Sequence, residues 1–159
     1  MAKVYLICGR VCSGKSTYAM QLVQKHRAVL LSSDEMTLAL FGQHCGEKHD
    51  EYVERAQRYL FDKSLEILAQ DIPVVLDWGF WMKEERDEAR AFYGEKGIAY
   101  EFHYIDVTDE EWHRRLIKRN ADVLKGDVSA YYIDENIAKK FGAIFEKPAP
   151  EEMDIWVQA

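Results

Sequence analysis

The sequence has little cysteine, little proline and no long apolar run. Its 159 residues include three cysteines and three prolines. A small, odd number of cysteines does not supply the disulfide framework of a small secreted domain. No apolar stretch approaches the roughly 18 residues of a membrane-spanning helix, and the run before Gly9 is too short for a secretory signal. The expected location is therefore the cytoplasm.

An excess of basic residues is also missing. The chain has 21 Lys and Arg against 28 Asp and Glu, a net charge of -7. General nucleic-acid binders are basic, so this charge argues against that class, although a local basic patch could still hold a nucleic-acid end. The 48% hydrophobic and 31% charged residues are ordinary for a globular protein. The length predicts a single domain over residues 1–159.

The cysteines themselves suggest little chemistry. Cys8 lies in an apolar run and is expected to be a small buried residue. Cys45 stands beside His44 and near His49, which raises the hypothesis of a metal ligand or nucleophile. A polar loop is the favoured interpretation there, whereas Cys8 and Cys12 have no nearby histidine or cysteine pair at zinc-site spacing.

Short apolar runs alternate with amphipathic segments along the whole chain. This alternation predicts a parallel sheet covered by helices on both faces. Strands are expected at 4–8, 28–33, 72–78, 100–107 and 154–159, and helices at 15–25, 50–70, 84–96, 108–120 and 133–145.

The most specific pattern is "GRVCSGKST" at residues 9–17, which has the form GxxxxGK[ST] between a strand and a helix. Glycines let such a loop curl so that its amides face a phosphate, and the following helix adds positive partial charge. Lys15 is expected to reach the β- and γ-phosphates, and the Ser16 hydroxyl to coordinate Mg²⁺. The segment therefore predicts a triphosphate-binding P-loop made of Gly9, Arg10, Val11, Cys12, Ser13, Gly14, Lys15, Ser16 and Thr17.

Carboxylates follow two of the expected strands, and in a parallel sheet the strand ends carry functional side chains. Asp34, in "LLSSDE", is placed to accept the proton of an attacking hydroxyl, or alternatively to cap a helix. Asp77, in "VVLDW", has the pattern of a Walker B carboxylate that orders Mg²⁺.

Arginines of the segment "EWHRRLIKRN" supply positive charge. Arg115 and Arg119 are four residues apart and share a helix face. They could stabilise the charge that spreads over a transferring phosphoryl group, or simply form a solvated surface. The polar residues 120–130, with Gly126 among them, are expected to form a lid, so that the whole lid region covers about 115–130.

With these motifs in place, the chain resembles small kinases related to polynucleotide 5′-kinase, zeta toxin and chloramphenicol phosphotransferase. The resemblance covers nearly the whole chain. It implies a nucleoside-kinase-like, three-layer α/β P-loop fold with a five-stranded sheet of order 2-3-1-4-5. It also implies transfer of the ATP γ-phosphate to a hydroxyl, with Asp34 matching the general base and Arg119 matching a lid arginine.

Two departures bear on the phosphate acceptor. The polynucleotide kinases carry an arginine soon after the aspartate, where this chain has "EMTLAL", and a second lid arginine, where it has "NADVL". Both help to grip phosphates, so a small hydroxylated molecule is the favoured acceptor. A polynucleotide or nucleotide kinase remains an alternative, as does a non-catalytic ATP-binding regulator. A GTPase is disfavoured because no NKxD motif is present.

Overall fold

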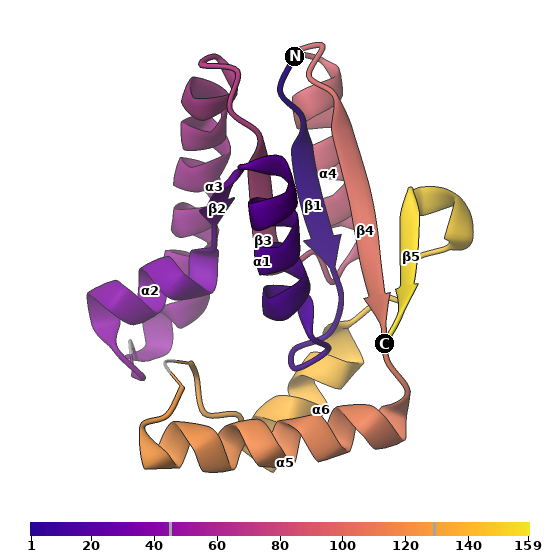
Figure 1. The fold of residues 1–159 in the computed structure, drawn as a ribbon. Helices are drawn as coiled ribbons and strands as arrows, with labels where there is room; N and C mark the ends of the chain where they lie inside the picture. Colours follow the sequence, from indigo (N-terminus) through magenta and orange to yellow (C-terminus); the bar gives the residue numbers. More distant parts are fainter. Residues whose placement is uncertain (45, 129) are drawn as a thin grey trace.

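A computed structural model describes residues 1–44, 46–128 and 130–159 (Figure 1). Cys45, and with it the ligand or nucleophile hypothesis, lies outside the described residues. Strands and helices alternate as the apolar pattern predicts. In chain order the elements are β1 (Val4–Cys8), α1 (Lys15–His26), β2 (Val29–Leu31), α2 (Ser33–Phe41), η1 (Gly46–Lys48), α3 (His49–Leu68), β3 (Val74–Gly79), α4 (Lys83–Gly94), β4 (Tyr100–Asp106), α5 (Asp109–Lys125), α6 (Glu135–Ile144), η2 (Pro150–Glu152) and β5 (Ile155–Gln158).

The five strands form one parallel sheet of order β2-β3-β1-β4-β5, which confirms the predicted fold class and order. The central strand β1 pairs on both sides, with Val4 opposite Val74 of β3 and Tyr100 of β4. All the carboxyl ends of the strands therefore meet at one edge of the sheet, where the P-loop begins.

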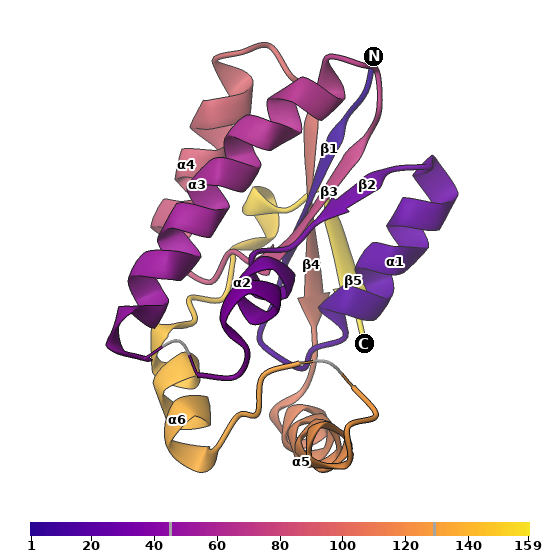
Figure 2. The same cartoon turned by 90° about the vertical axis from the view of Figure 1, so that its left-hand side faces the viewer.

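Successive side chains of β1 point to opposite faces and enter two separate hydrophobic clusters. Val4, Leu6 and Cys8 pack with residues of α3 and α4. Tyr5 and Ile7 pack on the other face, against α1. Figure 2 shows the resulting layers, with α3 and α4 on one side of the sheet and α1 on the other. Cys8 is fully buried, as expected of a small apolar residue.

A third hydrophobic cluster lies beyond the carboxyl edge of the sheet. It joins Val11 of the P-loop to Trp112 and Leu116 of α5 and to Ala138 of α6. Both helices cross below the strand ends in Figure 1. The cluster therefore fixes the P-loop and α5 relative to one another. Among the described residues, no helix combines the length and the apolar character needed to cross a bilayer.

Two local predictions are corrected by the structure. The second strand ends at Leu31 instead of residue 33, because Ser32 is the N-cap of α2 and accepts a hydrogen bond from the Glu35 amide. Residues 121–125, expected in a non-helical lid, continue α5, which ends where Gly126 adopts a left-handed φ of 78°. Alanine, leucine and valine in 121–125 sustain the helix, and glycine takes the left-handed C-cap without strain.

Candidate active site

The P-loop runs from the end of β1 to the start of α1, and its tight path requires its glycines. Gly14 has a φ of 95°, and a Cβ there would lie 3.2 Å from Nη1 of Arg115. A Cβ on Gly9 would lie 2.9 Å from Oγ of Ser13. Side chains at these positions would either strain the backbone or push neighbours away. The first amides of α1 have no intrahelical acceptor and are available to a phosphate.

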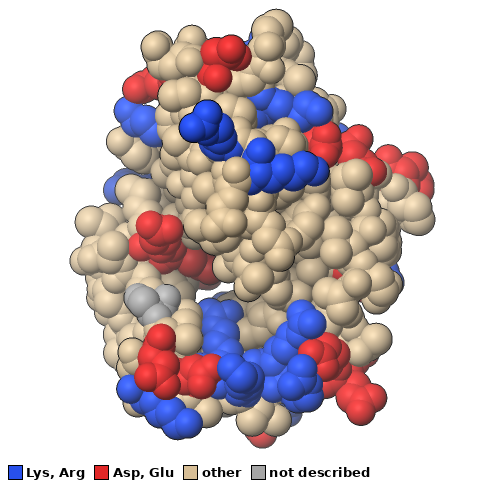
Figure 3. All heavy atoms as spheres, viewed as in Figure 1, with Lys and Arg blue, Asp and Glu red and all other residues tan. Residues whose placement is uncertain are grey.

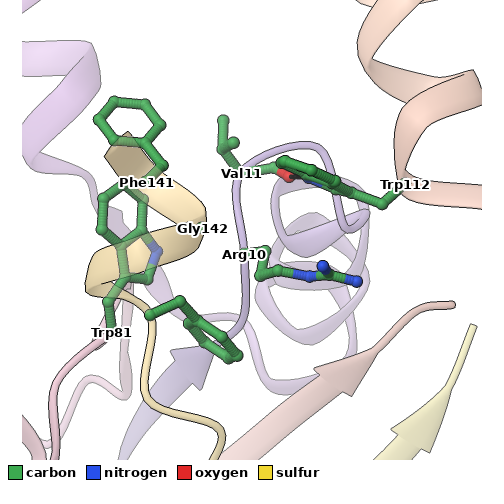
Figure 4. A pocket seen from close by; sticks show the side chains of 7 residues that line it. Arg10, Val11, Trp81, Trp112, Phe141 and Gly142 are labelled. Carbon is green, nitrogen blue, oxygen red and sulfur yellow. Dashed lines mark hydrogen bonds between the residues drawn. The ribbon is translucent and has the colours of Figure 1, made fainter. Parts of the chain in front are cut away.

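Two tryptophans anchor the P-loop backbone. The indole Nε1 of Trp81 donates to the carbonyl of Gly9 at 3.0 Å, and that of Trp112 donates to the carbonyl of Val11 at 2.6 Å. In Figure 4 they lie on either side of the loop, with Phe141 against Trp81. The Arg10 guanidinium lies 4.8 Å from the centre of the Trp112 ring. Neither tryptophan was predicted from the sequence, although each one closely follows a strand.

The crevice between these aromatic side chains is too narrow for a water molecule. It is lined by Arg10, Val11, Trp81, Trp112, Phe141, Gly142 and Phe145. Close packing of this kind supports the loop from behind and offers no room for a substrate.

Lys15, Ser16 and Asp77 lie together at the carboxyl edge of the sheet. The Nζ of Lys15 donates to the carbonyl of Arg10 at 3.0 Å, and Oγ of Ser16 donates to Oδ2 of Asp77 at 2.9 Å. Asp77 is 7% exposed. A hydroxyl and a carboxylate suit Mg²⁺, which takes oxygen ligands and keeps several waters. Among the described residues no cluster of three or more histidine, cysteine, aspartate or glutamate side chains could form a complete protein cage for a metal.

Asp34 lies in the first turn of α2 and faces the P-loop. Its side chain is accessible to solvent, yet the surrounding protein raises its pKa by disfavouring the charged form. The positive charges of Lys15 and Arg119 lower this pKa, and the negative charge of Asp77 raises it further. These interactions indicate that Asp34 lies within electrostatic range of Lys15, Asp77 and Arg119. The helix N-cap is Ser32, so the alternative capping role for Asp34 is wrong.

The two α5 arginines reach the P-loop from the opposite side. Arg115 donates to the carbonyl of Ser13 at 2.8 Å and to Glu111, whose pKa falls to about 2 because Arg114 and Arg115 both donate hydrogen bonds to it. Arg119 donates to Sγ of Cys12 at 3.2 Å. Among the described residues, the buried Nε of Arg119 has no hydrogen-bond partner. Arg115 thus contacts the loop through the Ser13 carbonyl, and Arg119 contacts it through the Cys12 side chain.

A cavity of about 470 Å³ opens beside the P-loop. Its volume is in the usual range for small-molecule sites. It is lined by Cys12, Ser13, Gly14, Thr17, Tyr18, Gln21, Ile105, Arg115, Arg119, Val157 and Ala159. Figure 3 shows this face of the molecule as hollowed, with basic side chains gathered over α5 and acidic side chains over α2.

Residues 130–133 connect α5 to α2 and to Gln43. Asn120 exchanges two hydrogen bonds with the backbone of Ile133. The Tyr131 hydroxyl lies 2.8 Å from Oγ1 of Thr37 in α2, and the Gln43 side chain bonds the backbone of the same segment. These residues were not predicted from the sequence, since each pair is separated by many positions and no local pattern relates them.

Several solved structures with a similar fold are described as kinases. A candidate kinase from Chloroflexus aurantiacus has a TM-score of 0.74 at 13% identity, covering 99% of this chain and 87% of that one. The adenosine phosphosulfate (APS) kinase CysC of Mycobacterium tuberculosis, solved with AMPPNP and APS, has a TM-score of 0.66 at 20% identity, with coverages of 99% and 88%. A gluconokinase from Sinorhizobium meliloti has a TM-score of 0.64 at 14% identity, with coverages of 98% and 81%.

At these identities the likeness shows a shared fold, that of the P-loop kinases. A sequence search found no match among curated proteins. A scan against family models gave a match over residues 4–140, which contain the P-loop, Asp34, Asp77 and both α5 arginines. This chain therefore belongs to the AAA domain family AAA_33, a kinase-like family of P-loop proteins.

Proposed function

We propose that this protein is an ATP-dependent kinase that transfers the γ-phosphate of ATP to a hydroxyl group of a small molecule. The observation that carries the proposal is the position of Asp34, opposite the P-loop and within electrostatic range of Lys15 and Arg119. A protein that only senses ATP has little need for a carboxylate facing the γ-phosphate. A kinase needs one to accept the proton of the attacking hydroxyl.

The residues around the P-loop account for the binding of ATP in this proposal. The loop amides and Lys15 would hold the phosphates, and the cavity beside the loop would take the base and ribose. Ser16 and Asp77 would hold Mg²⁺. When bound, this ion would neutralise charge on the β- and γ-phosphate oxygens. The Arg119 guanidinium, which lines this cavity, would contact the phosphoryl group or the nucleotide.

The transfer step needs a base for the hydroxyl proton and positive charge beside the phosphate oxygens. The hydroxyl oxygen of the acceptor attacks the γ-phosphorus, the bond from that phosphorus to the β–γ bridging oxygen breaks, and ADP leaves. Asp34 takes the hydroxyl proton. The positive charges of Lys15 and Arg119 stabilise the negative charge that develops on the phosphate oxygens during transfer, which lowers the barrier more than it strengthens ground-state binding.

ADP release by the purified protein tests the proposal, alone and with pooled hydroxylated metabolites, nucleosides and antibiotics. We expect turnover that depends on one component of the pool. Asp34→Asn should keep nucleotide affinity and lower turnover by about 10²–10⁴-fold. ATP binding without turnover in any pool would favour a regulatory protein. Transfer only to oligonucleotide 5′-hydroxyl ends would favour a polynucleotide kinase.

A further inference from the structure

We propose that the Tyr18 side chain forms part of the floor under the base and ribose of ATP, and that His103 is a positioning residue that holds the Tyr18 ring there. The inference rests on the ATP binding of the proposed function and adds two residues to that site. Tyr18 lies in α1 and His103 in β4, and neither belongs to the P-loop motif of residues 9–17.

The floor of the cavity beside the P-loop is apolar and comes from three elements. Tyr18 of α1, Ile105 of β4 and Val157 of β5 all line this cavity. They also pack in one hydrophobic cluster, and Ile105 and Val157 are paired directly in the sheet. A surface of this kind suits a flat, uncharged group such as a nucleobase.

Polar and charged residues line the rest of the same cavity. Cys12, Ser13 and Gly14 belong to the P-loop, and Arg115 and Arg119 come from α5. The phosphates of a nucleotide belong at the loop amides and beside these cations. The base and ribose are therefore left to face the apolar floor.

A chain of hydrogen bonds joins the Tyr18 side chain to β4. The Tyr18 hydroxyl lies 2.6 Å from Nδ1 of His103, and Nε2 of His103 lies 2.7 Å from Oε1 of Glu101. Glu101 also accepts a hydrogen bond from Nζ of Lys3 at 3.0 Å. His103 is 3% exposed, and it points to the same face of β4 as Ile105 because the two are two residues apart in a strand. The chain therefore fixes the Tyr18 ring beside the floor residue Ile105.

The chemistry of these groups leaves one arrangement of protons. Burial disfavours the charged form of Glu101, but hydrogen bonds from Lys3 and His103 lower its pKa overall. Burial lowers the pKa of His103. An ionised carboxylate only accepts, so Nε2 of the neutral imidazole carries the proton and Nδ1 accepts from the Tyr18 hydroxyl. Rotation of the Tyr18 ring would leave Nδ1 buried without a donor, which is unfavourable.

Binding of Mg-ATP, measured by calorimetry, tests the role of the ring. Tyr18→Ala should raise the Mg-ATP dissociation constant about 5- to 100-fold, the range expected when an aromatic ring that packs on a base is removed. Tyr59→Ala removes an exposed tyrosine of α3 and should bind as the wild type does. Thermal denaturation without ligand checks that both variants fold. An unchanged dissociation constant in Tyr18→Ala would overturn the inference.

Inorganic tripolyphosphate separates the floor from the P-loop, because it carries the phosphates without a base or ribose. With Mg²⁺ present, its affinity for Tyr18→Ala should equal its affinity for the wild type. Equal losses of affinity for ATP and for tripolyphosphate would mean that Tyr18 supports the P-loop and not the nucleoside, which would also overturn the inference.

Substitutions of His103 test the positioning role. His103→Leu removes the acceptor of the Tyr18 hydroxyl and should raise the Mg-ATP dissociation constant about 2- to 10-fold. His103→Asn places an amide oxygen near the position of Nδ1 and should restore most of the affinity. In a Tyr18→Ala background, His103→Leu should cause no further loss, since the ring that it positions is absent.

Two results would contradict the positioning role of His103. One is a further loss of affinity when His103→Leu is added to Tyr18→Ala. The other is a His103→Leu variant of lower thermal stability that binds Mg-ATP as the wild type does, which would make His103 a residue of the core alone. These are binding measurements, so a lack of phosphoryl transfer would overturn the kinase proposal and leave this inference intact. A wild type that does not bind Mg-ATP would overturn both.

Discussion

At the scale of single residues, Lys15 has the most direct expected effect on nucleotide binding. Lys15→Ala removes the cation that would reach the phosphates and leaves the loop backbone anchored by Trp81 and Trp112. A ligand at about 100 times its dissociation constant stabilises its protein by roughly 2.7 kcal/mol. We expect this stabilisation by Mg-ATP, measured by thermal denaturation, to disappear in Lys15→Ala. Lys25→Ala, an exposed lysine on the same helix, should retain it. A wild-type thermal shift with Mg-ATP in Lys15→Ala would argue against phosphate binding by this loop and its lysine.

Asp34 is expected to reduce stability at neutral pH, because the folded protein raises its pKa. Between the unfolded value near 3.8 and the raised folded value, the folded state binds more protons, so stability falls as the pH rises through this window. At pH values above this window Asp34 is ionised in the folded protein, and its reduction of the free energy of unfolding is at its maximum. Asp34→Asn should then be more stable than the wild type at pH 7, and this gain should shrink as the pH falls towards 3.8.

Urea denaturation at several pH values measures this effect. Glu35→Gln, in the same turn of α2, controls for the loss of a favourable charge near a helix N-terminus. A pH-independent difference between Asp34→Asn and the wild type would mean that Asp34 is not held in a site that disfavours its charge.

At the scale of secondary-structure elements, the contact between α2 and residues 130–133 joins the proposed base to the α5 arginine. Thr37 and Tyr131 meet through their hydroxyls, and the carbonyl of Tyr131 accepts from Arg119. Thr37→Val and Tyr131→Phe each remove one hydroxyl and little volume. We expect both to lower kcat with a nearly unchanged Mg-ATP dissociation constant, because each removes only one hydroxyl of the Thr37–Tyr131 pair and leaves the residues of the P-loop in place.

The double variant provides the decisive comparison. Residues in direct contact have non-additive effects, with interaction energies of about 0.5–3 kcal/mol. The double variant should therefore lose little more activity than either single variant. Tyr132→Phe, a neighbouring exposed tyrosine, should behave as the wild type. Additive losses in the double variant would show that the two hydroxyls act separately.

At the scale of the whole molecule, Arg86 ties distant segments together behind the site. Its guanidinium is 1% exposed and donates to the carbonyls of Phe80, Trp81 and Glu146 and to the carboxylate of Glu152. These contacts fix the chain that carries Trp81 to the connection between α6 and β5. Removing one partner of a buried ion pair typically costs about 3–5 kcal/mol.

Arg86→Met should therefore lower the free energy of unfolding, measured in urea, by about 3–5 kcal/mol. Arg58→Met removes the cation of an exposed pair with Glu54 and should change stability little. Similar small losses in both variants would mean that the buried network contributes no more than a surface ion pair.

The sequence by itself determined the fold class and the P-loop. The continuous apolar run of β1, which is buried on both faces of the sheet, and the helical spacing of apolar residues in α3 are local patterns. The glycines, Lys15 and Ser16 of the P-loop also act within nine consecutive residues. The spacing of these residues in the sequence predicts their arrangement in space, because backbone sterics and helix periodicity act over only a few residues.

The tertiary structure alone decided how the rest of the site is assembled. Trp81 and Trp112 anchor a loop that lies 72 and 101 residues away in sequence, and Tyr131 meets Thr37 across 94 residues. Pairings across such separations leave no periodic signal in the chain. They arise because folding brings the strand ends, α2 and α5 to one edge of the sheet.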